Sequence, residues 1–137
     1  MNVVGAIRKV ILDNAGVVAL LSSNTSVYPV LIPQTETYPA VSLAITSGRP
    51  SDSKTQNSPI DNVYIDAVML AKTYDEAQAI DTAIRVAIDG FYGNVTTSDS
   101  VVHHIDACRF LTRKDDFDEE NVLFIRVATY DVRYYLV

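Results

Sequence analysis

The fold is decided by residues 63–91, VYIDAVMLAKTYDEAQAIDTAIRVAIDGF, where one strand runs directly into one helix. In residues 63–70, apolar side chains occupy both phases of a two-residue period, which predicts a strand with two half-apolar faces. In residues 74–90, apolar side chains recur every three or four positions, which predicts a helix with one buried stripe. Thr73 and Glu76 form a capping-box pattern at the start of this helix, and Gly90 supplies its end.

Two helical segments and two strands are predicted before this unit. Residues 2–12 have the apolar spacing of an amphipathic helix, and residues 17–21 add a further helical turn. Residues 27–32 form a short strand candidate that ends at a proline, which favours an edge position. Residues 40–46 alternate between apolar and small polar side chains, as a half-buried strand does.

The next segment is a polar stretch, SGRPSDSKTQNSP at residues 47–59, which has the composition of a solvated loop. Loops of about a dozen residues without secondary structure are uncommon in compact domains and are usually functional or disordered. We therefore expect this loop to serve a partner rather than the core.

The remaining third alternates turns and strands. Residues 92–100 are a turn-rich connection, residues 101–112 a strand, and residues 114–121, KDDFDEEN, an acidic turn. Residues 122–137 form a last long strand whose apolar phase shifts, so we expect a bulge or bend near residues 128 and 129.

The predicted order is helix, three strands, helix, two strands. It favours an α+β fold, with a largely antiparallel sheet of about five strands and two helices on one face. A length of 137 residues and 48% hydrophobic composition suit a single domain spanning residues 1–137.

The sheet face without helices is the first candidate functional surface. Tyrosines and apolar residues that alternate along two strands would lie on it, and such a face is better suited to a partner than to water. We expect a subunit interface made by Tyr64, Val68, Leu70, Tyr130, Val132 and Tyr134, with Leu136 as a further candidate. The long loop could instead cover part of this face.

Charge and cysteine content exclude several classes of protein. The net charge of -6 gives no electrostatic reason to bind the outside of a nucleic acid or an anionic membrane. A single cysteine, Cys108, rules out an internal disulfide framework. No apolar run is long enough for a membrane span, and the N-terminus lacks the basic leader of a secretory signal.

The sequence offers little for chemistry. His103 and His104 are adjacent in a predicted strand, so they point to opposite faces and cannot share one metal through that strand. Cys108 is more simply explained as a small buried thiol, and the acidic run at residues 115–120 lacks the spacing of a calcium loop. No phosphate loop or nucleophile motif is present. We expect no metal, no cofactor and no catalytic residue, and hence a protein that is not an enzyme.

Four segments of the sequence, in their order along the chain, resemble a known protein family. VYPVLIPQ at residues 27–34, YPAVSLAITSGRP at residues 38–50, AKTYDEAQAI at residues 71–80 and the final RYYLV occur in that order. Together with the N-terminal helix they resemble the tail completion, or tail terminator, proteins of long-tailed bacteriophages. The resemblance covers nearly the whole chain. The acidic segment at residues 114–120 departs from it.

The resemblance implies a structural role in the virion. Such proteins form a ring, usually a homohexamer, that caps the tail tube, ends its polymerisation and provides the joint to the head. The implied partners are further copies of the chain, the tail tube protein and a head-completion or connector protein, while DNA passes through the lumen without specific binding. Assembly would take place in the host cytoplasm. In this setting we expect a tail-docking loop that includes Arg49, Asp52, Lys54, Gln56 and Asn57.

Two other functions remain open from the sequence. A head-tail connector or neck protein of the same virion would share the size, composition and ring formation of a terminator. A small ligand-binding α+β domain is the other alternative, and it would need a pocket with convergent polar groups.

Overall fold

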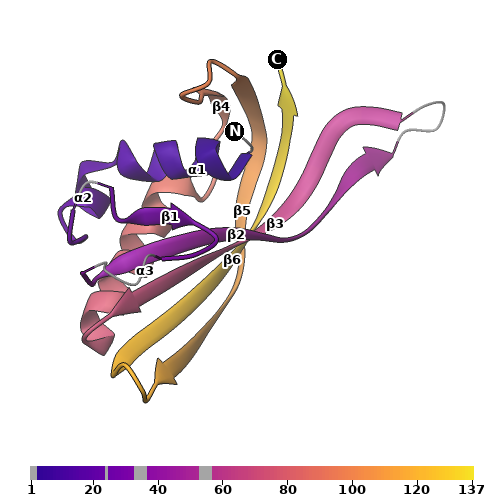
Figure 1. Cartoon of the computed structure of the whole chain (residues 1–137). Coiled ribbons are helices and arrows are strands. Elements are labelled where there is room, and N and C mark those ends of the chain that lie inside the picture. The colour runs from indigo at the N-terminus through magenta and orange to yellow at the C-terminus, as the bar shows by residue number, and fades with distance from the viewer. Residues whose placement is uncertain (1–2, 24, 33–36, 53–56) are drawn as a thin grey trace.

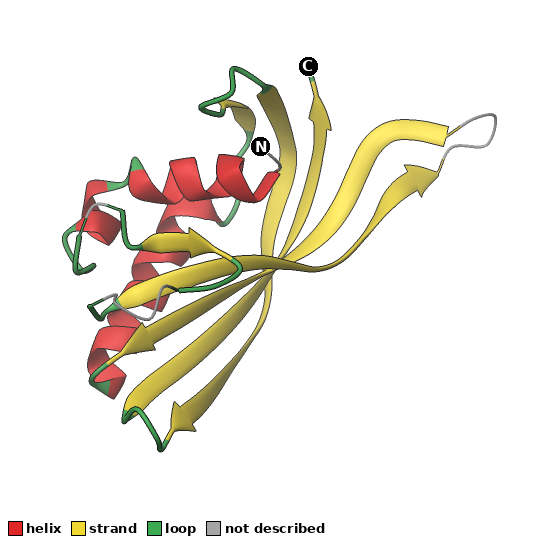
Figure 2. Cartoon of the chain, viewed as in Figure 1, coloured by secondary structure: helices red, strands yellow, loops and turns green. Residues whose placement is uncertain are grey.

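The computed structural model describes residues 3–23, 25–32, 37–52 and 57–137. Within them, one face of a curled six-stranded sheet carries the helices (Figures 1 and 2). The helices are α1 (Val3–Leu12), α2 (Ala15–Val18) and α3 (Tyr74–Ile88). The strands are β1 (Val27–Pro29), β2 (Ala40–Asp52), β3 (Asn57–Ala71), β4 (Gly93–Thr96), β5 (Val102–Asp118) and β6 (Leu123–Leu136). None of the described helices is long and apolar enough to cross a membrane.

The sheet has the order β1-β2-β3-β6-β5-β4. The short strand β1 runs parallel to β2, and every other pair of neighbours is antiparallel. The α+β class and the helices on one face agree with the sequence. The predicted count of about five strands and two helices was wrong, and so was the predicted order of elements, because β4 is an additional strand. The further helical turn predicted at residues 17–21 is a separate short helix, α2, which lies slightly earlier, at Ala15–Val18.

The core lies between the helices and one face of the sheet. Alternate residues of β3, from Val63 to Met69, are buried against the apolar stripe of α3, which includes Ile80, Ile84 and Ile88. Helix α1 adds its own buried stripe, with Ile7 and Ile11 fully enclosed. The unit predicted from residues 63–91 is therefore the centre of the fold.

Helix α3 begins as the sequence predicts. Thr73 has an extended backbone, and its hydroxyl oxygen accepts a hydrogen bond from the amide of Glu76 at 3.2 Å. This bond satisfies one of the amides that the first helical turn leaves free. Gly90, with a φ of 81°, follows the C-terminal end in a left-handed conformation that glycine adopts without steric cost.

Removal of this cap should cost a modest part of the stability. We expect Thr73→Ala to lower the free energy of unfolding by about 1 kcal/mol, the usual value of a threonine N-cap. Urea denaturation followed by circular dichroism measures this loss. Gln78→Ala, an exposed change within the same helix, is the matched control and should stay within about 0.5 kcal/mol of wild type. Equal stability of Thr73→Ala and wild type would contradict the cap.

The segment expected as a polar loop at residues 47–59 is largely strand. β2 continues to Asp52 and β3 begins at Asn57, with Arg49 opposite Asn62 and Pro50 opposite Asp61. The two strands project beyond the helices as a hairpin arm, which we define as residues 47–52 and 57–62 (Figure 1). The loop prediction was wrong because this segment has no apolar alternation to reveal a strand.

Of the last two strands, β5 is longer than predicted, whereas β6 spans nearly the predicted residues 122–137. β5 runs to Asp118, so only the end of the expected acidic turn is a turn. There the Asp118 carboxylate accepts hydrogen bonds from the amides of Glu120, at 3.1 Å, and Asn121, at 3.3 Å. The side-chain hydrogen bond from Asn121 lowers the pKa of Asp118 below its usual value.

A pairing irregularity occurs near the expected bulge, but on the partner strand. Phe110 pairs with Tyr130 and Thr112 pairs with Thr129, so the extra residue lies in β5. Pairing of β6 with β3 is continuous through the same region. The bulge predicted within the last strand was therefore assigned to the wrong strand.

Candidate functional site

The sheet face without helices has an apolar centre and a polar margin. Pairing between β3 and β6 places Val68 opposite Val127 and Leu70 opposite Ile125, all partly buried. One row further, the Thr129 hydroxyl donates a hydrogen bond of 2.6 Å to Asp66. Tyr64, on the same face, remains accessible. Three of the predicted interface residues, Tyr64, Val68 and Leu70, therefore share this face.

The other predicted interface residues lie on the opposite side of the sheet. Tyr130 is 1% exposed and Val132 is fully buried in the core beneath the helices, and Tyr134 packs partly against the same core. The reason is the register: Tyr130 pairs with Ile65, and residues paired across antiparallel strands share a face. The placement of these side chains on the uncovered face was wrong. Leu136, at the end of β6, is exposed.

The residues predicted for tail docking belong to the hairpin arm. Arg49, Asp52 and Asn57 are described only by their backbone pairing, as members of β2 and β3. Lys54 and Gln56 lie outside the described residues. Their role in docking stays a prediction, now placed on a projecting hairpin rather than on a loop.

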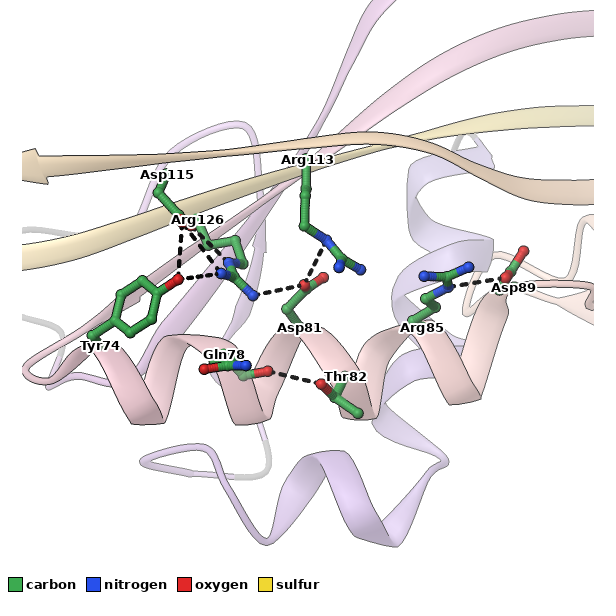
Figure 3. Close-up of polar contacts among 9 residues, drawn as sticks. All are labelled: Tyr74, Gln78, Asp81, Thr82, Arg85, Asp89, Arg113, Asp115 and Arg126. Carbon is green, nitrogen blue, oxygen red and sulfur yellow. Dashed lines mark hydrogen bonds and ion pairs between the residues drawn. The ribbon is translucent and has the colours of Figure 1, made fainter.

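A cluster of ion pairs, centred on the buried side chains of Arg126 and Asp81, connects α3 to the β5–β6 hairpin (Figure 3). Arg126 donates to Asp115 at 2.7 Å, to Asp81 at 3.2 Å and to the Tyr74 hydroxyl oxygen at 2.8 Å. Arg113 adds a second ion pair to Asp81 at 3.2 Å. The side chain of Arg126 is 8% exposed and that of Asp81 is 1% exposed. The guanidinium hydrogen bond also lowers the pKa of Asp115.

This cluster was missed in the sequence, although two signals were present. Asp81 lies four positions after the buried Ala77, within the apolar stripe of α3. Arg126 lies on the core phase of β6, two residues before the buried Ala128. A carboxylate and a guanidinium in core positions of separate elements indicate a buried pair, since single charges are rarely buried without a partner. In this structure the cluster fastens a helix to a hairpin.

The structure places each residue that was considered for chemistry. Cys108 is buried, as expected, and burial raises the pKa of its thiol to about 12. His103 and His104 point to opposite sides, with His103 in the interior and His104 bonded to the side chain of Asn94 at 2.6 Å. Among the described residues, no three carboxylate, histidine or cysteine side chains are grouped to hold a metal ion.

His103 should make the stability depend on pH. Burial lowers its pKa from the ordinary value of 6.5, and among the described residues its buried Nδ1 atom has no hydrogen-bond partner. The unfolded chain therefore binds a proton at His103 more readily than the folded chain does. The contribution of neutral, buried His103 to the free energy of unfolding is fully present above pH 6.5, and it is lost as the pH falls below that value. Chemical denaturation between about pH 7 and 5 should show a steeper loss for wild type than for His103→Leu. Identical slopes would contradict this assignment.

The chain is similar to known proteins in its fold but not in its sequence. No protein-family model matches the sequence, and no curated protein matches it. Among solved structures, the fold is similar to a chain of the "Virion of native gene transfer agent (GTA) particle". The TM-score is 0.63 at 19% identity, and the match covers 94% of this chain and 91% of the other. At this identity, the likeness establishes a shared fold over nearly the full length of both chains.

Proposed function

We propose that this chain is a structural protein of a phage-type virion, and that it caps the tail tube as a ring. The observation that carries the proposal is the fold likeness to a chain of a gene transfer agent virion, which extends over nearly all of both chains. The sequence resemblance to tail terminators supports the finer assignment. In this role the protein has no catalytic task.

The proposed ring is a homohexamer at the head end of the tail, assembled in the host cytoplasm. Its partners are the tail tube protein on one side and a head-completion or connector protein on the other. In a ring of this kind, each subunit uses two different surface patches, one for each neighbour, so the contact is heterologous. The ring closes because successive subunits are related by rotation. DNA would pass through the lumen without specific binding, in keeping with the net charge of -6.

Removal of the chain from particle assembly tests this function. Without it, electron microscopy should show tail tubes of variable and excessive length, because nothing ends their polymerisation. Supplying the wild-type chain should restore tails of one length. Tails of normal length beside heads that fail to join them would instead indicate a connector in the neck. Particles that assemble normally without the chain would overturn both assignments.

The hairpin arm is the proposed docking element for the tail. Replacing residues 51–60 by Asn-Gly should leave a two-residue turn that closes on the Pro50–Asp61 pair. An isolated two-stranded hairpin contributes little independent stability, so the melting temperature should stay nearly unchanged while tail capping is lost. Thermal melts and tail-length measurements check the two results, with Gln78→Ala as the control. Normal tails from this variant would exclude the arm as the docking element.

A further inference from the structure

The hairpin arm leaves the sheet with little support from the rest of the molecule. In the described part of the chain, β6 pairs with β3 only as far as Asp61, close to the base of the arm. From there the arm diverges from β5 and β6 and projects beyond the helices (Figure 1). A two-stranded ribbon is marginally stable and strongly twisted by itself. The direction of the arm must therefore be set where it joins the sheet.

A β-bulge lies in β2 at the base of the arm. Ile45 pairs with Ile65 across the two strands. The next pair is Ser47 with Tyr64, so Thr46 is an extra residue that lies opposite no residue of β3. The Thr46 hydroxyl donates a hydrogen bond of 3.3 Å to the Tyr64 carbonyl oxygen, which fastens the extra residue to β3. A bulge bends its strand and increases the local twist. The bulge at Thr46 therefore stands where the arm changes direction.

The bulge also decides which face each arm residue of β2 occupies. Side chains alternate along a strand, so without the bulge Ile45 and Ser47 would share a face. Residues paired across antiparallel strands do share a face. Ser47 therefore lies beside Tyr64 on the face without helices. Gly48 lies beside Val63, which is buried on the helix side. The extra residue thus sets both the course of the arm and the orientation of its side chains.

Gly48 allows a close approach of the two strands just beyond the bulge. A Cβ atom at this position would lie 2.8 Å from Val63 Cγ1, well inside the usual separation of packed carbon atoms. Val63 is only 6% exposed, and its β-branched side chain has little freedom to rotate away. Any larger residue at position 48 would therefore displace β2 from β3 at the base of the arm.

We propose that the bulge at Thr46 and the close approach at Gly48 fix the direction of the hairpin arm, and that this direction brings the arm to the tail tube. Thr46 and Gly48 are positioning residues, because they act through the arm and need not touch the partner. The inference rests on the proposed docking role of the arm, and it specifies the residues that aim it.

Deletion of Thr46 separates the direction of the arm from its pairing. The deletion removes only the residue that lies opposite no partner, so the arm should still form but should point elsewhere. Spin labels on Ser51→Cys in the arm and on Val86→Cys, an exposed position of α3, report the direction as a distance in electron paramagnetic resonance. Cys108 is buried and should stay unlabelled. The deletion should move the distance peak, whereas Thr46→Ser, which retains both the hydroxyl and the bulge, should leave it in place.

Gly48→Ala tests the close approach independently of the bulge. It should shift or broaden the same distance peak, because the new methyl group meets Val63 Cγ1. Val63→Ala in the same chain removes that atom and should restore the wild-type peak. Val63→Ala alone should leave the peak unchanged. A double variant that keeps the shifted peak of Gly48→Ala would contradict this contact as the cause.

Tail length shows whether the direction of the arm matters for docking. In particles that lack the chain, the Thr46 deletion and Gly48→Ala should leave overlong tails, while Thr46→Ser and Gly48→Ala/Val63→Ala should restore tails of one length. Thermal melts should show each variant folded; if the deletion prevents folding, Gly48→Ala and its double variant decide. An unmoved distance peak, or tails of normal length from a variant whose arm has moved, would overturn the proposal. Wild-type chain that fails to restore tail length would overturn the proposed function and the aim at the tube, while the distances would still decide whether these residues fix the arm.

Discussion

Arg126→Met should destabilise the fold by about 3 kcal/mol, the lower end of the range for breaking a buried ion pair. The reason is that Asp81, 1% exposed, would lose one of its two cationic partners and keep only Arg113. Asp81 Oδ1 already lacks a hydrogen-bond partner among the described residues, so little else could compensate. Urea denaturation at neutral pH measures the loss.

Two companion variants show whether the loss comes from the buried charge. Arg109→Met removes an ion pair of 3.5 Å in which the arginine is mostly exposed, and it should cost at most about 1 kcal/mol. The double variant Asp81→Leu/Arg126→Met removes both charges and should be more stable than Arg126→Met alone. A loss of less than about 1 kcal/mol for Arg126→Met would contradict the cluster as an anchor of α3.

Ile84→Asp should unfold the chain or leave it barely folded. Ile84 is fully buried in the centre of the α3 stripe, and an unpaired carboxylate there costs several kcal/mol, comparable with the usual total stability of about 5 to 15 kcal/mol. Val86→Asp, two residues away on the exposed side of the same helix, should change the free energy of unfolding by no more than about 0.5 kcal/mol. Cooperative melting of Ile84→Asp at the wild-type temperature would contradict this packing.

The features that could be predicted from the sequence are those set by local patterns. The period of α3 and its threonine cap depend on residues within a few positions of one another, and both are present in the structure. The same holds for the alternation of β3, whose Tyr64 and Val68 lie on the predicted face. Local pattern alone was enough to place the centre of the fold.

The features that could not be predicted depend on pairing between distant segments. The sheet face on which Tyr130 lies is set by its pairing with Ile65. The alternation of residues within β6 alone does not indicate which residue of β3 each of them pairs with. Arg126 and Asp81 are 45 residues apart, so their pair exists only once α3 lies on β6. The hairpin arm was missed for a different reason, because its sequence lacks the apolar alternation that predicts a strand.

Labelling of the chain in assembled particles tests the central claim most directly. A small peptide tag on the exposed C-terminal end, detected by gold-conjugated antibody and electron cryomicroscopy, would locate the protein. We expect the label at one place per particle, at the junction between the tail tube and the head. The density map should show a single ring of subunits at that junction. Label along the whole tube, within the head shell or absent from purified particles would contradict the assignment as a tail cap.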